Sequence, residues 1–466
     1  MEIFQNVPCT VCGCVCDDLT LTFEGDQLVT AERACDLARP WLFALNDARP
    51  PLALVSGKPA SLETAVDVAA GILRRSRRPL IYGLSRSSTP GQRAAVGLAD
   101  QLGAIIDTTA SIGHGPSIMA LQDVGESTCT LGEVAERSDL VIFWGANPAV
   151  SHPRHFERYS LEPTSEFLPN GRKDRYVVVI DIRENETATV ADEVILIRPG
   201  SDFELITALR MLIVNPDATP AVDCGASLDQ LRSLVQRMRG CRYGAVFFGL
   251  GIAHPGLGHR TVGALLQMVT ELNSVTRFIA RRLRVSGDVS GADSVLCWQT
   301  GFPFGVDLSR GYPRYNPGEY TTEDLLERRE VDACLIVGSL SLPTLSNAAL
   351  ASLASLPTIV LDSPNTSPTL EATVQFTTAV YGIHAAGTAY RMDEVPIPLR
   401  KLIDSPYPTD GDVLNAIARR LRESPESDAD GTGLVGGLLG VGVEDGIGQP
   451  VRGLVVHRDE HRTGRD

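Results

Sequence analysis

Residues 8–18 read Pro8-Cys9-Thr10-Val11-Cys12-Gly13-Cys14-Val15-Cys16-Asp17-Asp18, and this short stretch holds four of the ten cysteines in the chain. Cys9, Cys12 and Cys16 have the C-x2-C-x3-C spacing with which three thiolates of one loop bind one face of an iron–sulfur cube. A cube needs a fourth thiolate, and Cys35 is the only other cysteine before position 129. The spacing therefore predicts a 4Fe-4S site formed by Cys9, Cys12, Cys16 and Cys35.

Two other interpretations of the cysteines stay open. A zinc ion is the first, although structural zinc sites usually take two close pairs of ligands and not a triplet followed by a lone cysteine. The second is a set of free buried thiols in a reducing compartment. That interpretation is the preferred one for the scattered cysteines Cys129, Cys224, Cys241, Cys297 and Cys334. Cys14 is the spare thiol of the run, and we expect it to point away from the metal ligands.

Length and composition limit the class of protein. The 466 residues are too many for one hydrophobic core, so two or three lobes are expected. The content of 43% hydrophobic and 21% charged residues is that of an ordinary soluble protein. A formal net charge of −15 argues against a surface for nucleic acid or for an anionic membrane, because either needs a basic face.

The start of the chain and its cysteines bear on the cellular location. Met1 is followed by polar and acidic residues without a basic and then apolar leader. No run approaches the ~18 apolar residues of a membrane span. Cysteines spaced for metal and not for disulfides favour a reducing compartment. The sequence therefore predicts a cytoplasmic protein.

The chain beyond residue 55 alternates helices with short apolar strands. Before it, residues 19–23 alternate as a half-buried strand that leads into a turn at Gly25-Asp26. Ser61 can cap a helix to about residue 75, Thr89-Pro90 can begin another, and Gly103 can end it. Apolar strands are expected at residues 80–84, 104–107, 140–145, 176–181, 245–249, 334–338 and 358–362. Such strands between amphipathic helices are typical of parallel sheets covered on both faces.

Several of these strands end in glycine or aspartate, and parallel sheets bind ligands outside the carboxyl ends of their strands. Gly145-Ala146-Asn147-Pro148 and Gly249-Leu250-Gly251 are each typical of a turn with a close backbone approach, although plain turn chemistry explains them too. Ser201-Asp202-Phe203-Glu204 matches a capping box after Arg198-Pro199-Gly200, which predicts a helix N-terminus and an arginine where an anion could sit. Helix capping alone would explain this motif equally well.

A set of ordered motifs runs from Cys9 to about Leu421. They are the cysteine loop with Asp17-Asp18, Ala110-Ser111-Ile112-Gly113-His114-Gly115-Pro116-Ser117, Trp144-Gly145-Ala146-Asn147-Pro148 with His152-Pro153-Arg154-His155, Asp181-Ile182-Arg183, Gly301-Phe302-Pro303-Phe304, the stretch from Arg310 to Glu319, and Gly387-Thr388-Ala389-Tyr390-Arg391-Met392-Asp393. Together they resemble the molybdopterin oxidoreductases, and within these the B-subunit family of formylmethanofuran dehydrogenase.

This resemblance implies an α/β fold with doubly wound parallel sheets and without the superfamily's C-terminal barrel domain. The expected parts are an N-terminal cysteine-cluster domain (1–55), a discontinuous α/β lobe (56–137 and 242–422), an inserted α/β lobe (138–241) and a flexible glycine-rich tail (423–466). It also implies pterin-dinucleotide loops that carry Gly145, Asn147, Pro148, Asp181, Arg183, Gly200, Asp202, Gly387, Arg391 and Asp393.

Gly113 is the main departure from the family pattern. In the family, the residue before the His-Gly-Pro-Ser run is a cysteine or selenocysteine that binds tungsten or molybdenum. A glycine offers no ligand, whereas His114 and Arg284, which we align with the family's metal-proximal arginine, are retained. These three residues are interpreted as a relic active-site segment without a confident catalytic residue.

The same departure resembles the B subunit of the bacterial formyltransferase/hydrolase complex. That complex handles one-carbon units on tetrahydromethanopterin and a methanofuran-like carrier, on the route from formaldehyde to formate, and its chemistry resides in other subunits. The resemblance implies a redox-inactive scaffold that binds the hydrolase, the formyltransferase and the C subunit, keeps a structural 4Fe-4S cluster and lacks a tungsten- or molybdenum-pterin.

Two alternatives remain. One is an active B subunit of a tungsten- or molybdenum-dependent formylmethanofuran dehydrogenase, which the intact cysteine set favours because a scaffold has no evident need for it. The other is a hydrolase that uses His114, Ser117 and a carboxylate. It is the weakest hypothesis, because a lone histidine beside glycine and proline more often stabilises a turn.

Overall fold

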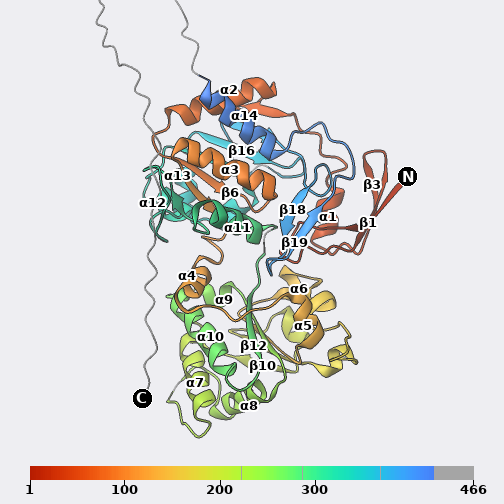
Figure 1. Cartoon of the computed structure of the whole chain (residues 1–466), viewed down its shortest axis with the longest axis vertical. Coiled ribbons are helices and arrows are strands. Elements are labelled where there is room, and N and C mark those ends of the chain that lie inside the picture. Colours follow the sequence, from red (N-terminus) through yellow and green to blue (C-terminus); the bar gives the residue numbers. More distant parts are fainter. Residues whose placement is uncertain (222, 255, 286, 368, 424–466) are drawn as a thin grey trace, which may run out of the picture. The chain divides into compact units, whose positions relative to one another are not determined.

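The computed structural model of the chain describes residues 1–423 except residues 222, 255, 286 and 368. The predicted tail therefore lies outside the described residues, apart from Glu423. The described chain combines two lobes built on parallel strands with a small antiparallel sheet near the N-terminus, in agreement with the predicted α/β class (Figure 1).

The N-terminal sheet consists, among the described residues, of the antiparallel strands β1 (Glu2–Val7), β2 (Leu19–Glu24) and β3 (Gln27–Glu32). The cysteine loop, residues 8–18, joins β1 to β2, and helix α1 (Ala38–Phe43) follows β3. Gly25 has a φ of 62° in the turn after β2, a conformation that glycine adopts readily. The predicted strand and its turn are both confirmed.

A larger sheet of nine strands, within the described chain, has the order β14-β13-β7-β6-β15-β16-β17-β4-β5. Its central strands are parallel, and the strands at its edges are antiparallel. The strands are β4 (Ala53–Val55), β5 (Lys58–Ala60), β6 (Pro79–Gly83), β7 (Ile105–Thr108), β13 (Val306–Asp307), β14 (Arg314–Tyr315), β15 (Ala333–Val337), β16 (Thr358–Asp362) and β17 (Val374–Thr377).

Helices pack on both faces of this sheet, as the doubly apolar strands predict. One core contains α2 (Leu62–Arg75), α3 (Thr89–Leu102), α11 (Val289–Thr300) and α14 (Asp410–Arg422), and the opposite core contains α12 (Thr322–Glu327) and α13 (Asn347–Leu353). Ser61 accepts a hydrogen bond from the Thr64 N–H at the start of α2, and Gly103 ends α3 with a φ of 61°, both as predicted. The N-cap of α3 is Ser88, one residue before the predicted Thr89.

The second lobe contains five parallel strands, counted over the described part of the chain, in the order β10-β9-β8-β11-β12. The strands are β8 (Leu140–Trp144), β9 (Tyr176–Asp181), β10 (Glu193–Leu196), β11 (Gly244–Phe248) and β12 (Phe278–Arg282). Helices α7 (Asp202–Val214), α8 (Leu228–Gly240) and α10 (Gly258–Leu272) cover one face. The other face packs against α5 (Leu131–Arg137), the π-helical turn η1 (Phe156–Ser160) and the cysteine domain.

The two expected boundaries at residues 55 and 241 differ from the observed sheets. Strand β4 pairs with β17, so residues 53–55 belong to the nine-stranded sheet. Strand β11 pairs with β8 and β12, so the sheet that we expected to end at 241 runs to Arg282. The physical reason is that strand partners depend on long-range pairing, which a strand's own apolar pattern does not specify.

The remaining elements connect these layers. They are α4 (Gly115–Val124), α6 (Pro148–Ser151), α9 (Leu250–Ala253), the short helical turns η2 (Gly171–Asp174), η3 (Glu186–Val190) and η4 (Ser339–Thr344), and the antiparallel pair β18 (Gly387–Tyr390) and β19 (Pro396–Leu399). Among the described helices, none combines the length and the apolarity needed to cross a membrane.

Candidate functional site

A cavity of about 400 Å³ opens at the carboxyl ends of β8, β9 and β10, and we call it the β8–β9 crevice. It is lined by Gly145, Ala146, Asn147, Asp181, Ile182, Arg183, Asn185, Pro199, Gly200, Asp202 and Gly251. Six of the ten residues assigned to the pterin-dinucleotide loops are in this set, namely Gly145, Asn147, Asp181, Arg183, Gly200 and Asp202. The position at the carboxyl edge of a parallel sheet is the one in which such folds bind nucleotides.

The two glycine turns at the rim of this crevice contact each other. Gly145 has a φ of 54°, and its carbonyl accepts a hydrogen bond of 3.1 Å from the Gly251 N–H. A Cβ atom added to Gly251 would lie 2.8 Å from the Cα of Gly145, which is too close for any side chain. The close approach predicted for both turns is therefore real, and it fixes α9 against the end of β8.

The polar side chains of the crevice are held by neighbouring groups. The Asn147 Oδ1 accepts hydrogen bonds from the hydroxyl (2.8 Å) and the N–H (3.2 Å) of Thr187. Asp181 accepts from the Ile182 N–H at 2.7 Å and from the Asn185 amide at 2.9 Å. Because these contacts fix the orientation of Asn147 and Asp181, the walls of the crevice are organised before any ligand arrives.

The helix start at Ser201 differs from the predicted capping box. The Ser201 hydroxyl donates to the Arg198 carbonyl at 2.7 Å and does not cap α7, while Arg198 pairs with Asp223 at 2.6 Å. Asp202 accepts from the Trp144 indole N–H at 2.8 Å, and burial raises the pKa of this carboxyl. The predicted anion position therefore has its arginine already paired.

The other predicted pterin residues lie outside the crevice. Pro148 is the first residue of α6. Gly387 packs so closely against Ser88 that a Cβ atom at this position would clash with it. Arg391 pairs with Asp393 at 2.6 Å, and Asp393 also accepts a hydrogen bond of 2.6 Å from the Leu131 N–H. The predicted late loop thus carries an internal ion pair that joins β18 and β19 to α5.

A second, narrower cavity of about 40 Å³ lies at the carboxyl ends of β6, β15 and β16. Arg86, which the sequence analysis did not single out, lines it and donates to the Val11 carbonyl at 3.2 Å. Asp362 accepts from the N–H and the hydroxyl of Ser339, and burial raises the pKa of this carboxyl to about 6. Through Arg86, the carboxyl edge of the nine-stranded sheet contacts the cysteine loop at this cavity.

The cysteine loop is compact and buried. The Cys9 N–H donates to the Cys16 carbonyl at 2.7 Å, which closes the loop. Burial raises the pKa of the Cys9 thiol, and the nearby thiols of Cys12, Cys16 and Cys35 raise it further. Cys14 does not point away as expected. Its thiol lies near those of Cys12 and Cys16, and its interactions with them raise the pKa of Cys14 and lower that of Cys12.

The spacing of these thiols can be compared with the requirements of two kinds of metal site. No three His, Cys, Asp or Glu side chains in the described chain are close enough together to bind one metal ion. One zinc ion would need its thiolates about 2.3 Å from a single point. In a four-iron cluster each thiolate binds a different iron, so the thiolates stand farther apart. The two kinds of site therefore need different spacings of the four thiols, and the 4Fe-4S site stays a prediction.

Two arginines from the second lobe hold the cysteine loop, and neither of these contacts was predicted from the sequence. Arg154 makes two hydrogen bonds to the Asp18 carboxylate, at 2.7 and 2.8 Å, and Arg158 pairs with both Asp17 and Asp18. The Tyr159 hydroxyl donates to the Cys14 carbonyl at 3.2 Å. These residues lie on or next to η1, and π-helical turns often occur at functional sites.

In the relic active-site segment, both ring nitrogens of His114 have hydrogen-bonding partners inside the protein. One ring nitrogen, Nε2, donates to the Leu283 carbonyl at 3.1 Å, and Nδ1 lies 3.2 Å from the Ser117 hydroxyl. Burial, together with the nearby Arg284 and other cations, lowers the pKa of His114 to about 3. His114 is therefore neutral near pH 7, and no carboxylate contacts it among the described residues. A hydrolytic triad of His114, Ser117 and a carboxylate is not formed.

Arg284 is buried close to this segment. Its guanidinium pairs with the buried Asp293, which also accepts a hydrogen bond of 2.7 Å from the Thr108 hydroxyl. The Arg284 carbonyl accepts a hydrogen bond of 2.7 Å from the Nε2 of His152. The pair fixes a positive charge near His114 without exposing it to water.

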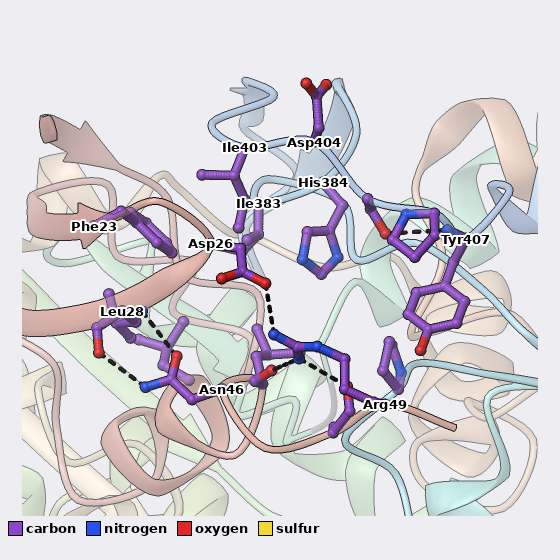
Figure 2. A pocket seen from close by; sticks show the side chains of 16 residues that line it. Phe23, Asp26, Leu28, Asn46, Arg49, Ile383, His384, Ile403, Asp404 and Tyr407 are labelled. Atoms are coloured by element: carbon purple, nitrogen blue, oxygen red, sulfur yellow. Dashed lines mark hydrogen bonds and ion pairs between the residues drawn. The ribbon is translucent and has the colours of Figure 1, made fainter. Parts of the chain in front are cut away.

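A different cavity, of about 50 Å³, lies between the β2–β3 turn and residues 383–407 (Figure 2). In Figure 2 the Asp26 carboxylate faces the Arg49 guanidinium, and their atoms are 2.7 Å apart. His384 accepts a hydrogen bond from the Val380 N–H, and burial lowers the pKa of this imidazole to about 4. The cavity is too small for a dinucleotide, and most of its polar groups are already paired.

Replacing Gly113 with cysteine is expected to change the free energy of unfolding by less than about 1 kcal/mol. A Cβ at this position would meet only the Thr109 carbonyl oxygen, at an ordinary 3.5 Å, and Gly113 does not have a positive φ. Denaturant unfolding of wild type and Gly113→Cys measures the difference. A loss above about 2 kcal/mol would mean that the space for a side chain here has closed.

The chain is similar in sequence to B subunits of two kinds of protein complex. No protein-family model matches the chain. It is 38% identical over 432 residues to the B subunit of tungsten-containing formylmethanofuran dehydrogenase 2 of Methanocaldococcus jannaschii, over 91% of this chain and 99% of that protein. It is 25% identical over 303 residues to the Fhc B subunit of the formyltransferase/hydrolase complex of Methylorubrum extorquens, over 62% of this chain and 75% of that protein.

A solved structure is also similar. It is the formyltransferase/hydrolase complex FhcABCD from Methylorubrum extorquens in complex with methylofuran, one chain of which matches with a TM-score of 0.66 and 24% identity. The match covers 79% of this chain and 98% of that one. At this level of identity the likeness demonstrates a shared fold and nothing further.

Proposed function

The chain belongs to the B-subunit family of formylmethanofuran dehydrogenase, and on this premise we propose that it carries a tungsten- or molybdenum-pterin and a 4Fe-4S cluster and takes part in the oxidation of a formyl group. The observation that supports this proposal is the β8–β9 crevice, where six of the residues that the resemblance assigns to dinucleotide loops line one open cavity of about 400 Å³.

The residues around the crevice fit a dinucleotide. Asp181 and Asn147 would meet a nucleotide base or ribose with oriented oxygen atoms, and Arg183 adds an exposed cation at the rim. When bound, the metal–pterin group accepts the electrons of the reaction, and the cluster passes them on. Cys9, Cys12, Cys16 and Cys35 would hold that cluster.

The overall reaction balances as R–NH–CHO + H2O → R–NH2 + CO2 + 2 H⁺ + 2 e⁻, where R–NH2 is a methanofuran-like amine. Arg284 would stabilise negative charge as it develops on the formyl oxygen, because its guanidinium is buried and held by Asp293. The neutral His114 would keep the segment around Gly113 in place through its hydrogen bond to Leu283. The two electrons need a one-electron acceptor, such as an iron–sulfur protein or a viologen dye.

A redox-inactive scaffold is the second candidate function, and Gly113 is the observation that favours it. Without a side chain at this position the protein supplies no ligand to a metal. In that case the chain would assemble with a hydrolase, a formyltransferase and a C subunit around a formyl carrier, by analogy with the FhcABCD complex. Partner subunits and such a carrier are proposed for either role.

Analysis of the purified complex separates the two candidates. Tungsten or molybdenum in stoichiometric amount, bound pterin and acceptor-dependent oxidation of formylmethanofuran are expected for the redox role. Release of formate without any acceptor, at a rate that viologen does not change, together with the absence of both metals, would overturn it in favour of the scaffold.

Replacing Cys35 with alanine is expected to remove most of the iron from the purified complex, because a cluster then has three thiolates. The matched control is Cys14→Ala, which also removes one thiol near the loop and should keep the iron. Iron content and the ultraviolet–visible spectrum measure both variants. Full iron in Cys35→Ala would exclude Cys35 as the fourth ligand.

A further inference from the structure

A separate cavity of about 560 Å³ is lined by α4, α7 and α10, and we call it the α7–α10 cavity. Helix α10 packs against both α4 and α7 (Figure 1). Gly200 is the one lining residue that this cavity shares with the β8–β9 crevice, and the one that belongs to the pterin-dinucleotide loops. The volume is within the range of about 300–1,000 Å³ that small-molecule sites occupy.

One wall of the α7–α10 cavity is the turn that leads into α10, with the sequence Gly256-Leu257-Gly258-His259-Arg260-Thr261. Leu257 at the N-cap offers no side-chain cap, and the first turn of α10 has no acidic residue. The first N–H groups of a helix lack partners inside the helix and carry partial positive charge. This end of α10 therefore favours an anion.

A buried hydroxyl beside the helix start also needs a partner. Thr261 is 9% exposed and lines the cavity, and its hydroxyl makes no hydrogen bond to any residue that the structure describes. Leaving such a group without a partner costs free energy. Thr261 therefore offers a hydrogen bond to a polar ligand in the cavity.

Arg260 adds a mobile cation to the same wall. Its guanidinium lies 3.9 Å from the Asp123 carboxylate, and the two side chains are 67% and 71% exposed. A pair at this distance and exposure is weak. Arg260 can therefore turn from Asp123 toward an anionic ligand.

The rim of the cavity is apolar on two sides. Phe203 of α7 is 47% exposed and Leu257 is 69% exposed, and both line the cavity. A Cβ atom added to Gly256 or to Gly263 would meet no atom within 4 Å, so both glycines border open space. An inorganic anion would fill a small part of this space, whereas an organic ligand would also bury Phe203 and Leu257.

We propose that the α7–α10 cavity binds a phosphate monoester of a small aromatic molecule, with the phosphate at the start of α10. Arg260, the Thr261 hydroxyl and the helix N–H groups supply donors from three directions, which suits the three terminal oxygens of a phosphate. The aromatic part lies between Phe203 and Leu257. Asp123 and Glu204 also line the cavity, so ligands with several phosphates are disfavoured.

Calorimetric titration of the purified complex with phenyl phosphate tests this inference. Inorganic phosphate lacks the ring of the proposed ligand, and benzoate has a carboxylate in place of the phosphate. We expect phenyl phosphate to bind at least about tenfold more tightly than either probe, because the ring buries apolar surface and the phosphate accepts more hydrogen bonds. Inorganic phosphate or benzoate bound as tightly as phenyl phosphate would overturn the assigned ligand class.

Variants locate the binding in this cavity. Arg260→Gln and Thr261→Val should each weaken the binding of phenyl phosphate at least about fivefold, because each removes a hydrogen bond to a charged group. Thr261→Ser keeps the hydroxyl and should bind like wild type, and Asp123→Asn should bind about threefold more tightly.

The matched control is Arg93→Gln, which removes an exposed arginine from α3 and should leave the binding unchanged. Arg260 is exposed, so Arg260→Gln decides the question even if Thr261→Val does not fold. Equal affinity of wild type and Arg260→Gln, or no binding of phenyl phosphate to wild type at millimolar concentration, would overturn the inference. Either result would leave the proposed redox and scaffold functions untouched, because neither depends on this cavity.

Discussion

Replacing Gly13 with alanine is expected to cost about 3 kcal/mol of folding free energy and to abolish most iron binding by the cysteine loop. A Cβ atom on Gly13 would overlap the backbone carbonyl oxygen of Arg284 and lie 3.3 Å from the Cβ of Met392. The Gly13 carbonyl also accepts a hydrogen bond of 2.8 Å from the Met392 N–H. Since backbone atoms cannot move aside as a flexible side chain can, the loop itself must shift.

Denaturant unfolding and iron content of the purified protein measure this effect. The matched control is Gly97→Ala, the same chemical change in α3, where a Cβ meets no atom within 4 Å. This control should be neutral or stabilising by about 0.5–1 kcal/mol, because alanine favours the helix over glycine. Normal iron content in Gly13→Ala would show that the loop can move away from Arg284 without losing its geometry.

Local chemistry made much of the fold predictable. The apolar strands at residues 80–84, 140–145 and 176–181 were located to within a residue or two, because both of their faces are buried and the signal does not depend on a partner. Ser61 and Gly103 were assigned correctly for the same reason, since capping involves neighbours in sequence.

Features that depend on distant partners were not predictable in this way. Ser201 has the sequence of an N-cap, yet its hydroxyl bonds to the Arg198 carbonyl, which the tight turn before α7 brings within reach. Strand β11 has the same apolar pattern as β15, and only the pairing with β8 assigns it to the second lobe. The sequence contains no signal for either outcome.

The candidate site also has features that the sequence predicted and features that depend on distant partners. Gly145, Asn147 and Asp181 come together because they end adjacent parallel strands, which is a property of the topology and could be anticipated. Arg391 and Asp393 match a family motif as well, but in this chain they pair with each other. A motif therefore located these residues in sequence without specifying their partners in space.

Replacing Asp18 with alanine is expected to cost about 2 kcal/mol at pH 7, because Arg154 loses its main partner and Arg158 loses one of its two carboxylates in a largely buried place. The Asp18 side chain is 19% exposed and that of Arg154 is 8% exposed. Among the residues that the structure describes, Arg154 would then keep one acidic partner, Glu157, whose side chain is 53% exposed. Since the two arginines hold the cysteine loop to η1, iron binding should weaken together with stability.

The effect of this substitution should depend on pH in a defined direction. Burial alone would raise the pKa of Asp18, but the hydrogen bond from Arg154 and the charges of Arg158 and Arg154 outweigh it and lower the pKa below its ordinary value of 3.8. A carboxylate with a lowered pKa stabilises the folded state above its unfolded pKa and loses that contribution as the pH falls through its folded pKa. The difference in stability between wild type and Asp18→Ala should therefore be constant from about pH 5 to 7 and shrink below about pH 4.

Asp17→Ala is the matched control, because Asp17 is 44% exposed and its ion pair, within the part of the chain that the structure describes, is with Arg158. An exposed pair of this kind contributes about 0.5 kcal/mol, so the control should stay close to wild type at every pH. Equal losses in Asp17→Ala and Asp18→Ala would indicate that the acidic pair acts only through its net charge. A loss confined to Asp18→Ala that fades at acid pH would assign this part of the stability to the two hydrogen bonds between Arg154 and Asp18, beside the contacts that Arg158 and Tyr159 make with the same loop.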